Sequence, residues 1–99
     1  MDKRVYEEVY RRSRGLCEVC GSNGGGMVEL HHIARRRVEE SPENCIMLCY
    51  EHHRGTWGVH GSRGSELDKQ LKRTLQGYYK AQGKSEEEIR ELMGGKLYE

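Results

Sequence analysis

Two pairs of metal-binding residues constrain this chain more than any other feature of its sequence. Cys17 and Cys20 form a C-x-x-C pair, and Cys49 and His52 form a second pair with the same spacing that ends in histidine. Three thiolates and one imidazole are a common tetrahedral donor set for structural zinc. A zinc ion held by all four would close a long loop, so the sequence predicts a small domain built around this metal.

The composition favours such a metal. The chain has 99 residues, of which 34% are hydrophobic and 33% are charged. A domain of this size and composition buries little apolar surface, and a structural metal compensates for that. We therefore expect a single α+β domain over residues 1–99. The four cysteines could instead form disulfides, but their spacing suits a metal and the N-terminus carries no apolar signal segment.

The charge is spread unevenly along the chain. Residues 1–84 carry 15 Lys and Arg against 11 Asp and Glu, whereas residues 85–99 carry 2 against 5. The mildly basic body is compatible with binding phosphate backbones but does not indicate nucleic acid by itself. No stretch is long and apolar enough to span a membrane, so we expect a soluble, cytoplasmic protein.

Hydrophobic periodicity predicts an N-terminal helix followed by a hairpin. The helix should run over about residues 4–14, with apolar or aromatic residues at Val5, Tyr6, Val9 and Tyr10. Weak alternation predicts a strand over 27–33, which should pair with a second strand over 45–48. The first strand would deliver His31 and His32 to opposite sides.

Two further helices are predicted after residue 64. Ser65, with Asp68 three residues later, predicts the N-cap of a helix that ends near Ala81 and packs through Leu67, Leu71, Leu75 and Tyr78. Ser85 and Glu88 predict the capping box of a last helix, which should end before the glycine pair at 94–95.

A second set of polar residues lies inside the zinc loop or just past it, and the zinc does not need it. The set comprises His31, His32, Asn44 and His53. A helical turn that opens at Cys49 would point His52 and His53 about 100° apart, so that only His52 faces the zinc. We expect Cys45 to be a buried thiol rather than a ligand.

Two loops have open interpretations. Arg35, Arg36 and Arg37 form the densest positive patch of the chain, which is either a solvated surface or a contact to phosphates. Residues 54–64 contain four glycines with Trp57 and His60, and this segment could close over a ligand or serve only as a connection.

The order of these residues resembles the HNH endonuclease family. The resemblance covers about residues 15–64 and is carried by Cys17-x-x-Cys20, His31-His32-Ile33, Asn44 and Leu48-Cys49-x-x-His52-His53. The following residues 54–61 are also similar to the loop of small HNH proteins of bacteriophages and prophages, which are commonly associated with DNA packaging machinery. The resemblance implies a zinc-stapled ββα-metal (His-Me finger) domain, flanked here by helices over about 4–14 and 65–93.

The resemblance also implies roles for single residues. His32 matches the general base, and Asn44 matches the asparagine that fixes the loop and orients this base. His31 and His53 match ligands of a catalytic divalent ion, whose expected identity is Mg²⁺ or Mn²⁺, with Ni²⁺ or Zn²⁺ also possible. The structural zinc ligands match Cys17, Cys20, Cys49 and His52. The candidates for contacts to the DNA backbone are Arg35, Arg36, Arg37 and Arg54.

Three positions depart from the family pattern. The second zinc pair ends in His52, where cysteine is commoner. Residues 38–41 stand where the family often has a pair of glycines. Trp57 occupies a position at which many members place another histidine on the metal side, and His60 is the nearest substitute, as a ligand or a phosphate contact.

These inferences predict a metal-dependent endonuclease that hydrolyses DNA phosphodiester bonds. A monomer should nick one strand with low sequence specificity, and its partners could be phage terminase or other packaging proteins in the cytoplasm of a bacterial host. One alternative is a non-catalytic zinc-binding adaptor for DNA or protein, which would need neither Asn44 nor the extra histidines. Another is a thiol oxidoreductase that uses Cys17 and Cys20, which would carry no zinc.

Overall fold

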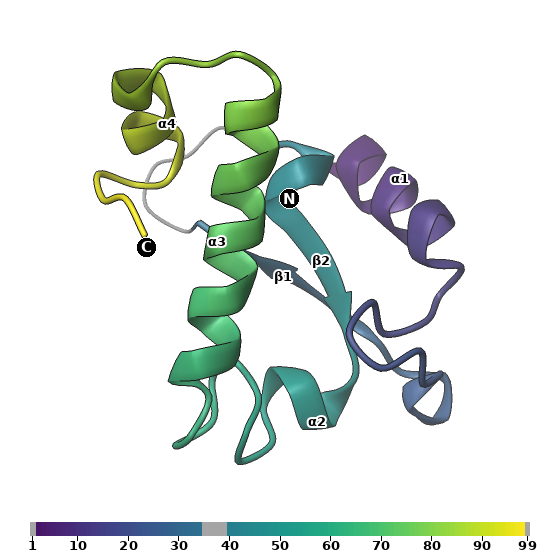
Figure 1. Cartoon of the computed structure of the whole chain (residues 1–99). Helices are drawn as coiled ribbons and strands as arrows, with labels where there is room; N and C mark the ends of the chain where they lie inside the picture. Colours follow the sequence, from purple (N-terminus) through teal and green to yellow (C-terminus); the bar gives the residue numbers. More distant parts are fainter. Residues whose placement is uncertain (1, 35–39, 99) are drawn as a thin grey trace.

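The computed structural model describes residues 2–34 and 40–98. Helices and a two-stranded sheet make a small α+β structure, as predicted (Figure 1). In chain order the elements are α1 (Lys3–Ser13), the 3-10 turn η1 (Gly24–Gly26), β1 (Glu29–His32), the 3-10 turn η2 (Pro42–Asn44), β2 (Cys45–Leu48), α2 (Tyr50–His53), α3 (Ser65–Ala81) and α4 (Glu86–Leu92). Among the described residues, no helix is both long and apolar enough to cross a membrane.

The strands β1 and β2 form an antiparallel hairpin between α1 and α3 (Figure 1). The register pairs His31 with Ile46 and His32 with Cys45. Because successive side chains of a strand point to opposite faces, the two histidines lie on different sides of the hairpin, as predicted. The first strand begins two residues later than predicted, because the N–H of Met27 still closes the η1 turn.

Helix α1 covers the face of the hairpin to which His32 belongs. The side chain of Asp2 caps the helix by accepting a hydrogen bond from the N–H of Arg4 at 2.8 Å. Val5 and Val9 are buried against a cluster formed by Cys45, Met47, Val28 and Leu30. The tyrosines that the periodicity grouped with them are more exposed, because the narrow hairpin contacts only the stripe of α1 that the two valines occupy.

Arg12 fastens α1 to the hairpin and to the turn that follows the helix. Its guanidinium donates to the carboxylate of Glu18 at 2.8 Å and to the carbonyl of Cys45 at 2.8 Å. The hydrogen bond to Glu18 raises the pKa of Arg12 above its ordinary value. Glu18 also accepts the N–H of Met47 at 2.9 Å, so one ion pair joins three segments.

Helix α3 covers the opposite face of the hairpin. Its buried residues Leu75 and Tyr79 form one apolar cluster with Ile33, Ala34, Ile89 and Met93. The prediction that Tyr78 belongs to the buried stripe is wrong, since Tyr78 is 40% exposed and Tyr79 only 5%. The C-terminal residues Ile89 and Met93 cover the side of α3 on which Tyr79 lies. Tyr79 is therefore the buried tyrosine, and Tyr78 is the more exposed one.

The predicted cap of α3 is also wrong, whereas that of α4 is confirmed. Gly64 occupies the N-cap of α3, and Ser65 already belongs to the helix. A Cβ at Gly64 would overlap the carbonyl oxygen of Gly58, so only glycine fits at the end of this turn. The helix begins immediately after it. Ser85 and Glu88 make the predicted capping box, with reciprocal hydrogen bonds of 3.0 and 3.2 Å.

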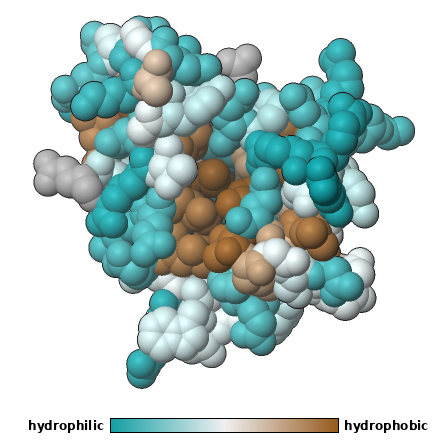
Figure 2. Space-filling model, turned by 45° about the vertical axis from the view of Figure 1, so that its right-hand side comes forward, coloured by the Kyte–Doolittle hydropathy of each residue, from teal (hydrophilic) through white to brown (hydrophobic). Residues whose placement is uncertain are grey.

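An apolar groove remains between α3 and the hairpin. It has a volume of about 260 Å³ and is lined mainly by Ile33, Cys45, Ile46, Leu71 and Leu75. Figure 2 shows apolar side chains gathered in a hollow on one face of the molecule, surrounded by polar groups. Burial raises the pKa of the Cys45 thiol to about 11, in agreement with the prediction that this cysteine is a buried thiol.

Asn44 joins the two ends of the segment between the strands. Its side chain is 1% exposed. The Oδ1 atom accepts the N–H of Ala34 at 2.7 Å, and Nδ2 donates to the carbonyl of Ala34 at 2.8 Å. The main-chain carbonyl of Asn44 accepts the N–H of Ile33 at 2.8 Å. The side-chain amide of Asn44 therefore takes the place of a main-chain partner for Ala34, and it extends the hydrogen bonding of the hairpin by one residue.

We predict that Asn44→Ala lowers the free energy of unfolding by about 3 kcal/mol, because it leaves both main-chain groups of Ala34 buried without these partners. Urea unfolding of the zinc-loaded protein measures this change. Gln70→Ala, on the exposed side of α3, is the matched control and should shift stability by less than about 0.5 kcal/mol. Equal stabilities of the two variants would contradict the structural role of Asn44.

Candidate metal centres

Four donor groups from two distant segments meet beside α2. Cys17 and Cys20 lie in a turn after α1 that is closed by a hydrogen bond of 2.8 Å from the N–H of Gly21 to the carbonyl of Cys17. Cys49 occupies the N-cap of α2, and His52 lies in that helix. The four ligand atoms all lie within 4.8 Å of one another.

The spacing of these atoms fits a tetrahedral zinc ion. The distance between the Sγ atoms of Cys20 and Cys49 is 3.8 Å, and Nδ1 of His52 lies 3.3 Å from Sγ of Cys49 and 3.9 Å from Sγ of Cys17. Zinc bonds of about 2.0–2.3 Å in a tetrahedron give ligand separations of about 3.3–3.8 Å. The cluster could therefore bind a metal ion such as zinc.

The cysteines of this cluster are free thiols in different electrostatic surroundings. Burial raises the pKa of Cys17, but main-chain N–H groups of Cys49, Cys20 and Val19 outweigh it and hold the pKa below its ordinary value. Burial raises the pKa of Cys49. A bound cation would offset the effect of burial on Cys49, since zinc takes its sulfur ligands as thiolates.

Three histidines form a second cluster. His31 comes from β1, His53 from the last residue of α2, and His60 from the loop before α3. Their ligand atoms also lie within 4.8 Å of one another, and their ring centroids are 4.8–5.4 Å apart. The structure thus brings His60 beside the two residues that the sequence singled out, and it divides the neighbours His52 and His53 between two clusters.

Tight turns of the glycine-rich loop deliver His60. The N–H of His60 donates to the carbonyl of His53 at 2.9 Å, which fixes the loop against the end of α2. A Cβ at Gly61 would overlap the carbonyl oxygen of Gly55, so the loop can close in this way only with glycine there. Trp57, at 65% exposure, lies outside the cluster and has the guanidinium of Arg63 over its ring.

Glu29 orients His53. Its carboxylate lies 2.8 Å from Nδ1 of His53 and also accepts from Nε of Arg54 at 3.1 Å. The hydrogen bond from His53 is the largest cause that holds the pKa of Glu29 below its ordinary value. An ionised carboxylate only accepts, so Nδ1 carries the proton and Nε2 is the atom left for a metal.

Glu40 holds His32 on the other side of the hairpin. Nε2 of His32 lies 2.7 Å from Oε1 of Glu40, and Oε2 of Glu40 accepts the N–H of Asp2 at 2.6 Å. The bond from His32 is the first cause of a lowered pKa at Glu40, and the N–H of Asp2 is the next. His32 is therefore tied, through Glu40, to the beginning of α1.

Only one of the four arginines that were predicted to contact the DNA backbone lies among the described residues. Arg54 is exposed and paired with Glu29, whereas Arg35, Arg36 and Arg37 lie outside the described residues. Sequence reasoning missed both glutamates. Glu29 could have been found, because it lies two residues before His31 on the same face of a strand. Glu40 could not, because it lies eight residues after His32 and no periodicity relates the two positions.

Comparisons with known proteins add no relative. No protein-family model matches this chain, and neither a curated protein nor a solved structure matches it.

Replacement of an exposed cysteine should damage the protein more than replacement of a buried one. We predict that Cys20→Ala loses bound zinc and lowers the melting temperature by more than 10 °C, because structural zinc supplies folding energy. Cys45→Ala, the matched control, should keep one zinc per chain. Metal analysis and thermal unfolding measure both effects. A full zinc content in Cys20→Ala would show that these four residues do not form a metal site.

The orienting role of Glu29 predicts a change in affinity for a second ion. Glu29→Ala should weaken binding of Co²⁺ or Ni²⁺ to the zinc-loaded protein by about ten- to a hundredfold, as is usual when a partner of a ligating histidine is lost. Titration calorimetry measures this affinity. Arg54→Ala is the control for the lost ion pair and should have little effect. If Glu29→Ala binds normally while His53→Ala does not bind, Glu29 has no orienting role.

Proposed function

We propose that this chain is a metal-dependent endonuclease of the HNH type, which hydrolyses phosphodiester bonds of DNA. In this proposal β1, β2 and α2 form the ββα-metal unit, and the Cys17, Cys20, Cys49 and His52 cluster is its structural zinc site. The three-histidine cluster is the site of a separate catalytic ion. The observation that carries the proposal is this second cluster, since a zinc-binding adaptor needs only the first.

His32 is the proposed general base. In this proposal Nε2 of His32 donates its proton to the Glu40 carboxylate, 2.7 Å away, and Nδ1 serves as the proton acceptor. In the reaction Nδ1 takes a proton from a water molecule, and the water oxygen attacks the phosphorus. The bond from phosphorus to the 3′ oxygen breaks and this oxygen takes a proton from solvent, which leaves a 5′-phosphate and a 3′-hydroxyl. His32 is half-buried, so it is held in place and still accessible to water.

Asn44 positions the base through the main chain. Its bonds to Ala34 and Ile33 fix the end of β1 immediately after His32. Asn44 is almost completely buried and does not face solvent, so we assign it a positioning role and no part in proton transfer.

The chemistry of the donor set limits the identity of the catalytic ion. When it is bound, a divalent ion would stabilise the negative charge that grows on the leaving oxygen. His31, His53 and His60 offer three imidazole nitrogens, which suit Zn²⁺, Ni²⁺ or Mn²⁺ better than the oxygen-seeking Mg²⁺. We therefore expect Mn²⁺ or Ni²⁺ to support activity better than Mg²⁺.

The proposed substrate contact is to one DNA strand at a time. Arg54 lies beside the three-histidine cluster, where its exposed guanidinium could contact a phosphate. Arginine contacts to phosphates give affinity without base recognition, so a monomer is expected to nick with low sequence specificity. Phage packaging proteins are the proposed source of any further specificity.

A plasmid assay tests the proposal. Zinc-loaded protein is incubated with supercoiled plasmid and with Mn²⁺, Ni²⁺ or Mg²⁺ in separate reactions. We expect conversion to open circles that DNA ligase can reseal, because the products carry a 5′-phosphate and a 3′-hydroxyl. His32→Ala should lower the rate by at least about a hundredfold, the usual size of a general-base effect.

The controls separate catalysis from folding. His32→Ala must keep the zinc content and melting temperature of the wild type, and Gln70→Ala should nick at the normal rate. Open circles produced equally by His32→Ala would point to a contaminating nuclease. Absence of nicking with every ion, in protein that is folded and zinc-loaded, would favour the adaptor function.

A further inference from the structure

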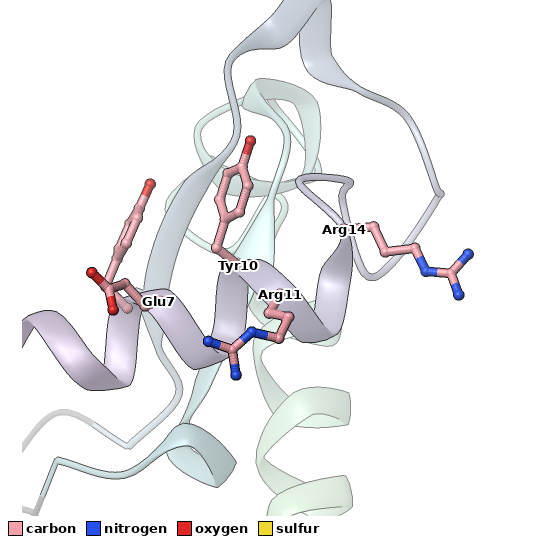
Figure 3. A pocket seen from close by; sticks show the side chains of 5 residues that line it. Glu7, Tyr10, Arg11 and Arg14 are labelled. Carbon is pink, nitrogen blue, oxygen red and sulfur yellow. The ribbon is translucent and has the colours of Figure 1, made fainter.

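The outer side of α1 carries a pair of stacked tyrosines beside two arginines. The rings of Tyr6 and Tyr10 are 6.2 Å apart at an angle of 25°. Together with Glu7, Arg11 and Arg14 they line a shallow groove of about 600 Å³. Figure 3 shows the Tyr10 ring standing off the helix, the Arg11 side chain extending from the helix, and the Arg14 side chain pointing outward from the residue that follows the helix.

The packing of α1 does not account for these tyrosines. Val5 and Val9 already bury the helix against the hairpin, while Tyr6 is 36% and Tyr10 49% exposed. The hydroxyl of Tyr10 lies so close to Gly15 that a Cβ there would approach it to 2.8 Å. Held between Gly15 and Tyr6, the Tyr10 ring is preorganised, so a ligand that stacks on this pair need not immobilise it first.

The charge of this surface favours an anionic ligand. Neither Arg11 nor Arg14 forms an ion pair with any residue in the described ranges 2–34 and 40–98. Among the described residues that line the groove, Glu7 is the only acidic one, so the two arginines leave a positive balance. Flat aromatic rings beside cations match a nucleic-acid strand with unpaired bases, which offers both ring faces and phosphates.

We propose that this surface of α1 binds single-stranded DNA, with bases stacked on Tyr6 and Tyr10 and with phosphates paired to Arg11 and Arg14. A duplex keeps its base faces stacked inside and would use only the arginines. An acidic peptide would likewise leave the tyrosine rings without a flat partner. The combination of rings and cations therefore selects the single strand.

The position of α1 connects this surface to the proposed base. The helix packs on the face of the hairpin to which His32 belongs, and Asp2 at its first turn bonds the Glu40 carboxylate that holds His32. With a rise of about 1.5 Å per residue, Tyr6 lies roughly 6 Å along the helix from Asp2. If the proposed function holds, the substrate is DNA with a single-stranded segment next to the bond that is cut.

A binding experiment without cleavage tests this inference. Fluorescence anisotropy measures the affinity of zinc-loaded His32→Ala protein for a labelled 20-nucleotide pyrimidine strand and for a 20-base-pair duplex. We expect tighter binding of the single strand. Adding Tyr6→Ala and Tyr10→Ala together should weaken it by at least about tenfold, given the usual contribution of base stacking on aromatic side chains.

Two control variants separate the rings from other effects. Tyr6→Phe with Tyr10→Phe keeps both rings and should bind like the parent protein. Tyr78→Ala removes a tyrosine of α3, at 40% exposure and outside the proposed ββα-metal unit, and should also bind normally. Arg11→Ala with Arg14→Ala should weaken binding and reduce its dependence on salt. Circular dichroism confirms that each variant is folded.

The outcomes distinguish this inference from the proposed nuclease. Equal affinities for single strand and duplex, or no effect of the double alanine variant, would overturn the inference whatever the plasmid assay gives. An acidic peptide gives a further test. If a peptide with the sequence of residues 84–94, which carries four glutamates, bound as tightly as the single strand, the inference would also be overturned. Tyrosine-dependent strand binding by a protein that nicks no plasmid would support this surface and reject the nuclease.

Discussion

The meeting of Cys17 and Cys20 with Cys49 and His52 is the constraint on which the other elements depend. It joins the turn after α1 to the junction of β2 and α2. The strands have four residues each and α2 also has four, and neither a hairpin nor a helix of this length is stable in water alone. A metal bound by all four residues would hold the turn after α1 against the junction of β2 and α2. It would supply the stability that the short elements lack. The ion pair of Arg12 with Glu18 supports the same connection, because Glu18 lies within the metal-binding turn and also bonds the main chain of β2.

Two pairs of adjacent histidines serve three different surroundings, and regular secondary structure is what separates them. On β1, neighbours point to opposite faces, so His31 joins the three-histidine cluster while His32 bonds Glu40. On α2, neighbours point about 100° apart, so His52 faces the cysteines and His53 faces Glu29. A short chain can thus place several donor groups close together without letting them compete for one ion. A shift of register in β1 would remove His31 from the three-histidine cluster, and unwinding of α2 would remove His52 and His53 from both clusters.

Local rules predicted the elements well and their junctions less well. The helix over 4–14, the hairpin, the capping box at Ser85 and the burial of Cys45 follow from periodicity and side-chain chemistry that neighbours in sequence decide. Tyr79 replaces Tyr78 in the core because α4 packs on one side of α3, which is a tertiary effect. Gly64 replaces Ser65 as the cap because a turn of the preceding loop closes against Gly58. The same limit hid Glu40, which lies eight residues from His32 in the sequence. Glu29 shares a strand with His31, so the two-residue period of a strand could have identified it.

His60 changes the chemistry that the sequence suggested. Two imidazoles would leave most of an ion's coordination shell to water, an arrangement that Mg²⁺ accepts. A third imidazole, placed by the hydrogen bond between the main chains of His60 and His53, would offer such an ion another nitrogen in place of a water. Nitrogen donors raise affinity along the series from Mn²⁺ to Cu²⁺ and contribute little for Mg²⁺. The glycines that let the loop close are therefore more than a connection: by admitting His60, they shift the preference of the proposed catalytic site from hard cations toward transition metals.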